Sequence, residues 1–132
     1  LNYAHDLGKY DFVIDPGPVE HCFNIGKAIM TAASAVKVGG SILHVTPMTA
    51  INHGFYNVSP TLYYDFYTQN GWKIDQFFAS HKGDRVEIDP HQRARLFPEC
   101  WIWVSARRVT DNGALAFPVQ HKYLKKSDLK VA

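Results

Sequence analysis

Two apolar runs in the first half of the chain have the character of buried strands. Residues 12–14 are short, apolar and partly β-branched, and the run ends abruptly at Asp15. Residues 41–46 form a similar run that stops before Pro47. Each run is followed at once by polar and turn-forming residues. Because a strand that ends in polar groups often borders a site, both strand ends are candidate positions for chemistry.

The segment between these runs has helical periodicity. Asn24 is a favourable N-cap, and apolar residues then recur at i, i+4, i+7 and i+11 as far as about Lys37. Gly39 and Gly40 are expected to end this helix, because glycine readily adopts the left-handed conformation of a C-terminal cap. Strand, helix and strand together predict a parallel unit with a right-handed crossover.

The second half predicts one more helix and two strands. Ser59 and Pro60 are a typical helix start, and Asn70 and Gly71 a typical end. Residues 72–79 and 100–109 read as strands with no helix between them, so we expect them to pair antiparallel. The later strand is apolar on both faces, as expected of a strand with helices on either side. The segment 81–99 is expected to be a solvated loop or a lid.

The predicted fold is therefore α/β, with parallel strands, a terminal antiparallel strand pair and helices on the faces of the sheet. Residues 1–110 would form this domain, and residues 111–132 a partly packed tail with a turn at 111–113. At 132 residues the chain is long enough for a core but short for a complete doubly wound unit.

Composition narrows the class of protein. The net charge is only +2, and no basic stripe is present, so nucleic-acid binding has no electrostatic signature. No apolar run approaches the ~18 residues that a membrane span requires, and no signal peptide is evident. Cys22 and Cys100 lie beside apolar runs, which favours reduced core thiols and a cytoplasmic protein. A small or neutral partner is expected.

Polar side chains gather after both predicted parallel strands. Glu20 and His21 closely follow the first strand, and His53 and Tyr56 follow the second. Since the carboxyl ends of parallel strands share one edge of a sheet, the two loops should face each other across one cleft. Structural alternatives stay open: Glu20 as favourable charge at a helix start, and His21 as a helix-entry residue bonded to nearby backbone.

Six short motifs carry a resemblance to a known family. The chain resembles the C-terminal half of class I S-adenosylmethionine-dependent methyltransferases over roughly residues 5–110, and is similar to a bacterial subgroup of small-molecule or uncharacterised members. The motifs are Asp11-Phe12-Val13-Ile14-Asp15, Val19-Glu20-His21, Val38-Gly39-Gly40, Asn52-His53-Gly54-Phe55-Tyr56-Asn57-Val58-Ser59-Pro60-Thr61-Leu62, Asp65-Phe66 and Asn70-Gly71.

The resemblance implies S-adenosylmethionine as cofactor and a small-molecule substrate. It implies catalytic roles for Glu20 and His21, which would orient the substrate or remove its proton. The remaining roles it implies are cofactor contacts from Asp15, Pro16 and Gly17, and substrate contacts from His53 and Tyr56.

The glycine-rich turn with which such enzymes hold their cofactor has no counterpart in this sequence. No Gly-x-Gly motif occurs, so weak or absent cofactor binding is expected of this chain alone. The strand at residues 12–15 would then lack a neighbour, which invites self-association or pairing with a complementary N-terminal segment. A noncatalytic, self-associating module is the alternative function.

Other chemistries find less support in the sequence. A metal site from Asp15, Glu20, His21, His44 and His53 lacks the i, i+4 spacing of helical zinc ligands, so no metal is expected. A Gly-x-Ser-x-Gly elbow is absent, which argues against a hydrolase. His44 lies inside a predicted strand and is interpreted as a core or edge histidine, and Ser59 as a helix cap.

Overall fold

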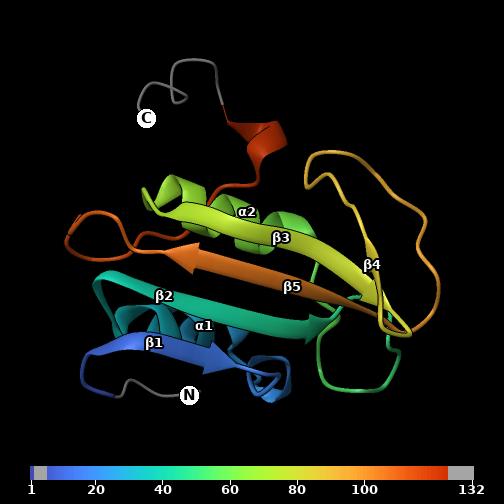
Figure 1. Ribbon diagram of the computed structural model, residues 1–132, viewed down its shortest axis with the longest axis horizontal. Helices are drawn as coiled ribbons and strands as arrows, with labels where there is room; N and C mark the ends of the chain where they lie inside the picture. Colours follow the sequence, from blue (N-terminus) through green and yellow to red (C-terminus); the bar gives the residue numbers. More distant parts are fainter. Residues whose placement is uncertain (2–5, 125–132) are drawn as a thin grey trace.

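A mixed five-stranded sheet and two α-helices make up the computed structural model, which describes residue 1 and residues 6–124 (Figure 1). The sheet order is β1-β2-β5-β3-β4, so the chain is an α/β protein as predicted. The elements are β1 (Tyr10–Asp15), the 3-10 turn η1 (Val19–His21), α1 (Ile25–Ser34), β2 (Val36–Pro47), α2 (Pro60–Gln69), β3 (Lys73–His81), β4 (Asp84–Val86), β5 (Cys100–Arg107) and η2 (His121–Tyr123).

Strand pairing agrees with both pairings that the sequence predicted. β1 runs parallel to β2, with Asp15 opposite His44. β5 is antiparallel to both of its neighbours, β2 and β3, and lies between them. The predicted parallel unit and the predicted antiparallel pair are therefore both confirmed. β4 adds a short hairpin to β3 inside the segment that was expected to be a loop.

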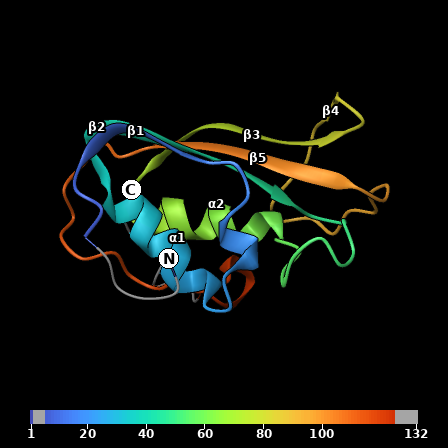
Figure 2. The same ribbon diagram turned by 90° about the horizontal axis from the view of Figure 1, so that it is seen from below.

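The helices α1 and α2 lie on the same face of the sheet (Figure 2). The core forms between this face and the helices, from residues such as Ala32, Ile42, Tyr63 and Ile102. The expectation of helices on both faces is wrong for the residues that the structure describes. In β5 the buried residues alternate with half-buried ones, among them Trp101 and Trp103, which belong to the opposite face. That face, called here the open sheet face, carries apolar side chains without a helix over them.

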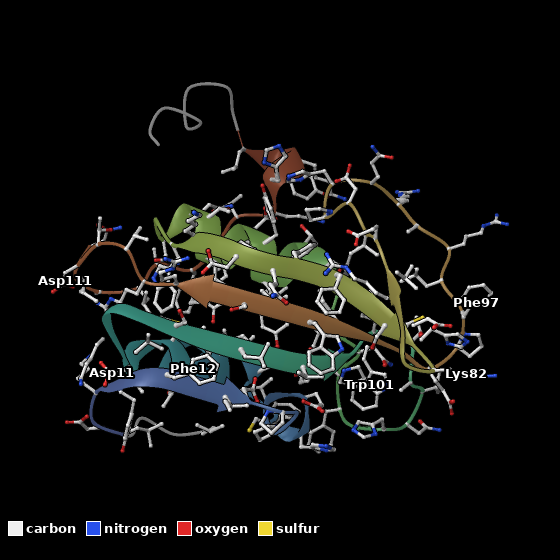
Figure 3. The ribbon with its side chains drawn as sticks, in the orientation of Figure 1. Asp11, Phe12, Lys82, Phe97, Trp101 and Asp111 are labelled. Atoms are coloured by element: carbon white, nitrogen blue, oxygen red, sulfur yellow. The ribbon has the colours of Figure 1, made fainter. Side chains whose placement is uncertain are left out.

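The side chains of β1 show most clearly that the open sheet face is uncovered. Only Val13 of the predicted buried run packs against the core. The side chains of Phe12 and Ile14 point the other way and are 54% and 58% exposed (Figure 3 labels Phe12). β1 is also an edge strand, paired only with β2 among the described residues. The apolar run was therefore correctly predicted as a strand but wrongly predicted as buried.

The two glycines after α1 have a different role from the one predicted. α1 ends at Ser34 and not near Lys37, and β2 begins at Val36, so Gly39 and Gly40 lie inside a strand. A Cβ atom at Gly40 would lie 2.7 Å from the backbone oxygen of Asp11. The pairing of β1 with β2 is irregular at this point, and glycine permits the close approach of the two backbones.

The segment 111–124 packs against α2 and is continuous with the domain. The Asn70 side chain donates to the carbonyl oxygen of Ala116 and accepts from its backbone N–H. The carboxylate of Asp65 accepts from the backbone N–H of His121. Residues 125–132 of the predicted tail lie outside the described residues. Cys22 and Cys100 are both free thiols, as predicted. Within the described part of the chain, no helix has the length and apolar character needed to cross a membrane.

Candidate functional site

The loops that follow β1 and β2 meet at one end of the sheet. In Figure 1 the arrowheads of β1 and β2 point to the same end, where η1 and the loop after β2 lie. The backbone N–H groups of Phe55 and Tyr56 both donate to the carbonyl oxygen of Glu20, at 3.0 and 3.3 Å. The Tyr56 hydroxyl donates to the carbonyl oxygen of Phe23 at 2.7 Å. These bonds hold the two loops together, so the loops meet at one edge of the sheet but bond directly to each other, without the predicted cleft between them.

A buried chain of polar groups runs beneath this loop pair. Oδ2 of Asp15 lies 2.5 Å from Nδ1 of His44, and Nε2 of His44 lies 2.6 Å from the hydroxyl of Tyr67. All three side chains are buried. A carboxylate only accepts hydrogen bonds, so Nδ1 of His44 donates to Asp15, and we assign Nε2 as the acceptor of the Tyr67 hydroxyl. Burial raises the pKa of Tyr67 well above its ordinary value, which keeps this hydroxyl a donor.

His44 is therefore a satisfied core histidine, as the sequence predicted. Its ring also stacks on Tyr63, with ring centroids 4.5 Å apart. The hydrogen bonds from His44 to Asp15 and to Tyr67 were not predicted from the sequence. The link fixes the Asp15 carboxylate at the carboxyl end of β1, because Oδ2 is held by His44. Oδ1 of Asp15 is buried and has no hydrogen-bond partner among the described residues.

A second group of titratable side chains lies at the loop pair itself. Oε1 of Glu20 is 3.8 Å from Nε2 of His21 and 3.5 Å from Nε2 of His53. The two imidazole rings are 5.3 Å apart, centroid to centroid. Glu20 is fully buried, whereas the side chains of His21 and His53 are 52% and 39% exposed. The group, called here the Glu20 cluster, has a buried acid on one side and a solvent-facing opening on the other.

Two glycines make room for Glu20. A Cβ atom at Gly17 would lie 2.8 Å from Oε1 of Glu20. A Cβ atom at Gly54 would lie 3.0 Å from Cγ of Glu20 and 3.1 Å from its carbonyl oxygen. Gly17 also has a φ of +115°, which side chains rarely adopt. Glycine is thus favoured at position 54 by close packing against Cγ and the backbone of Glu20, and at position 17 by its positive φ.

Burial raises the pKa of Glu20 above its usual value. The backbone of Glu20 and the imidazoles of His21 and His53 oppose this shift in the pKa, while the carboxylate of Asp15 adds repulsion in the same direction as burial. Neither carboxylate oxygen of Glu20 has a hydrogen-bond partner among the described residues. A buried, unbonded acid of this kind is costly to the fold, and such groups concentrate at functional sites.

A groove opens beside the Glu20 cluster. Its volume is about 580 Å³, and His53 and Trp101 are among the side chains that line it. The ring of His53 meets that of Trp101 edge to face at a centroid distance of 4.9 Å. Figure 3 labels Trp101 at the end of the sheet where the loop after β2 lies. Trp101 was not among the predicted site residues, although a tryptophan near a strand end adjoining polar loops is a usable signal.

The other predicted site residues have simpler surroundings. Pro16 is exposed and Gly17 half-buried. Tyr56 is half-buried, with its hydroxyl engaged by the Phe23 carbonyl, so it joins the loops. Ser59 occupies the N-cap position of α2, but its side chain makes no capping hydrogen bond. All the predicted site residues lie at this end of the sheet, and Asp15, Glu20, His21 and His53 supply its titratable groups.

Comparison with protein-family models, with curated proteins and with solved structures gave no match. The site is therefore interpreted from its own geometry.

Proposed function

We propose that this chain forms the substrate-side portion of an S-adenosylmethionine-dependent methyltransferase that acts on a small molecule. The observation that carries the proposal is the convergence of Asp15 and the Glu20 cluster at the carboxyl ends of two parallel strands. Ligands of open α/β sheets bind at this edge. The mixed sheet, with its terminal antiparallel pair, agrees with the fold that the sequence resemblance implies.

The buried carboxylates suit the electrostatics of that cofactor. S-adenosylmethionine, when bound, supplies an electrophilic methyl group on a positively charged sulfur. Oδ1 of Asp15 is buried and unpaired, and its negative charge would favour a cation near the end of β1. Pro16 and Gly17 follow directly and would line the same side. The glycine-rich cradle is not in this sequence, so another segment would have to supply it.

The Glu20 cluster supplies the groups that a nucleophile needs. Burial makes the Glu20 carboxylate a stronger base than an exposed one, because the charged form is disfavoured. His21 and His53 flank it and face solvent, so they would orient the substrate and carry the proton away. The groove beside His53 and Trp101 would receive the substrate body. Positioning of the nucleophile is the main task of such a site.

Cofactor binding tests the proposal. Titration calorimetry with S-adenosylhomocysteine would compare the 132-residue chain with the same chain extended through its upstream reading frame. We expect no binding, or millimolar binding, by the chain alone and at least about tenfold tighter binding by the extended polypeptide, a change of ~1.4 kcal/mol. Asp15→Asn should weaken the tighter binding, whereas Asp11→Asn, near the opposite end of β1, should not. An extended polypeptide that binds no cofactor would refute the proposal.

One observation favours the alternative of a noncatalytic, self-associating module. Phe12 and Ile14 are exposed on an edge strand whose far side has no partner among the described residues. Exposed apolar edges of this kind favour pairing with another chain. Sedimentation velocity over a hundredfold concentration range decides the point, since the module requires a reversible dimer and the enzyme portion does not.

A further inference from the structure

We propose that Glu20, His21 and His53 bind a divalent transition-metal ion. This inference goes beyond methyl transfer, because it requires only three side chains of this chain and the metal. The sequence argument against a metal site relied on helical ligand spacing, which these residues lack. Here the ligands come from two loops, which η1 and the segment after β2 bring together.

The distances between the candidate ligand atoms fit one ion. Oε1 of Glu20 lies 3.5 Å from Nε2 of His53 and 3.8 Å from Nε2 of His21. One ligand atom from each of the three side chains lies within 4.8 Å of the others. Metal–ligand bonds of ~2.0–2.2 Å in a tetrahedral site place ligand atoms about 3.3–3.6 Å apart. Small side-chain adjustments would complete such a site, whereas the observed distances are too long for hydrogen bonds.

Burial of the acid gives independent support. Glu20 is fully buried, and both of its carboxylate oxygens lack a hydrogen-bond partner among the described residues. Buried charges in proteins are normally paired or bound to a metal. Oε1 of Glu20 faces two imidazole nitrogens, which offer the remaining ligands. A metal ion would satisfy this carboxylate without any rearrangement of the two loops.

The surroundings also hold the ligands in place. Gly17 and Gly54 pack against Glu20 so closely that neither position tolerates a Cβ atom without a shift. The ring of His53 is held edge to face by Trp101. The two imidazoles remain partly exposed, which leaves the outer side accessible to water or to a substrate atom. Three protein ligands with one open position is the arrangement of catalytic zinc sites.

The ligand set selects the class of metal. Two imidazoles and one carboxylate suit Zn²⁺ and Fe²⁺, whereas Mg²⁺ and Ca²⁺ prefer oxygen ligands. A bound metal would lower the pKa of a coordinated hydroxyl group, so it would replace Glu20 as the group that activates a nucleophile.

A second group, Asp65, His91 and His121, also has its ligand atoms within 4.8 Å of one another. Its carboxylate is already engaged. Oδ2 of Asp65 accepts from the Thr61 hydroxyl and from the backbone N–H of His121. This group therefore lacks the unpaired buried acid, and it provides a matched control for the experiment.

Metal binding by the full chain tests the proposal. Metal-free protein, with any polyhistidine tag removed, would be titrated with Zn²⁺ against a chromogenic chelator, and with Co²⁺ for its visible spectrum. We expect one equivalent of Zn²⁺ to bind. Removing an outer partner of a metal ligand typically costs 10–100-fold in affinity, so Glu20→Gln and His53→Ala should each cost at least about 100-fold. His91→Ala should leave stoichiometry and affinity unchanged.

Nuclear magnetic resonance of the wild-type protein keeps the test independent of how the variants fold. Co²⁺ should shift or broaden the imidazole signals of His21 and His53 before those of His91 and His121. Absence of stoichiometric binding would overturn the proposal. So would binding that survives Glu20→Gln or disappears in His91→Ala. Because no cofactor is present, failure of methyl transfer would not affect the result.

Discussion

Removal of the Tyr67 hydroxyl tests the buried chain that links Asp15, His44 and Tyr67. In Tyr67→Phe, Nε2 of His44 loses the hydroxyl 2.6 Å away, its one hydrogen-bond partner within residues 6–124, in a fully buried position. A buried acceptor left without a partner costs about 1–3 kcal/mol. For a chain of this length, 1 kcal/mol corresponds to roughly 4 °C in Tm, so the variant should melt about 4–12 °C below wild type.

Tyr63→Phe is the matched control, one helical turn earlier on α2. Tyr63 is as buried as Tyr67 and loses the same atom, but its hydrogen bond, which it accepts from the Thr46 hydroxyl, is long at 3.3 Å. The ring stacked on His44 is retained. We therefore expect Tyr63→Phe to cost less than about 1 kcal/mol, near the low end for a weak bond.

Urea unfolding followed by circular dichroism measures both variants, and nitrogen chemical shifts of the His44 ring report its protonation. Tyr67→Phe should move the Nε2 resonance, and Tyr63→Phe should leave it in place. Equal losses of stability in the two variants would refute the proposed hydrogen bonds among Asp15, His44 and Tyr67. Unchanged nitrogen chemical shifts of the His44 ring in Tyr67→Phe would refute them as well.

Single substitutions at three other places test the site and the sheet. Glu20→Gln in chelator should stabilise the protein at neutral pH. Burial raises the pKa of Glu20 above its usual 4.5. The folded wild-type protein therefore holds this proton more tightly than the unfolded chain, and it loses stability as the pH rises from 4.5 through the raised pKa. The gain should vanish in urea titrations below about pH 4, and a gain independent of pH would contradict the reasoning. Gly54→Ala should cost about 1–3 kcal/mol by crowding Glu20, whereas Gly26→Ala, where a Cβ meets nothing closer than 3.9 Å, should be neutral or stabilising. Thermal melts that rank these two alanines the other way would exclude crowding. Ile14→Lys should reduce any self-association in sedimentation velocity, and Phe117→Lys, at a still more exposed position on the tail, should not.

The parallel strands and the meeting of their loops were predictable because each depends on local chemistry. A short apolar run that stops at Asp15 identifies β1, and the run before Pro47 identifies the end of β2. Once the two strands are parallel, geometry brings Glu20 and His53 to one edge. These residues could be grouped without knowing any side-chain contact.

Features that depend on distant packing were not predictable in the same way. Val36 fits the helical periodicity of α1 and also the start of β2, and its pairing with Tyr10 of β1 favours the strand. The exposure of Phe12 depends on what covers the open sheet face, which no local pattern encodes. The bond from Tyr67 to His44 requires α2 to lie over β2, so sequence separation concealed it.

The bonds between the tail and α2 determine where the chain can be shortened. The backbone carbonyl and N–H of Ala116 both bond to the side chain of Asn70. The backbone carbonyl and N–H of Val119 bond to the side chain of Gln69 in the same way. A protease that cut at the Gly113 turn and released the remainder would strip hydrogen bonds from the last turn of that helix. Limited digestion of the native protein should therefore leave the segment 111–124 attached to α2. A shortened chain that ends near residue 110 would be a poor starting point for crystallisation.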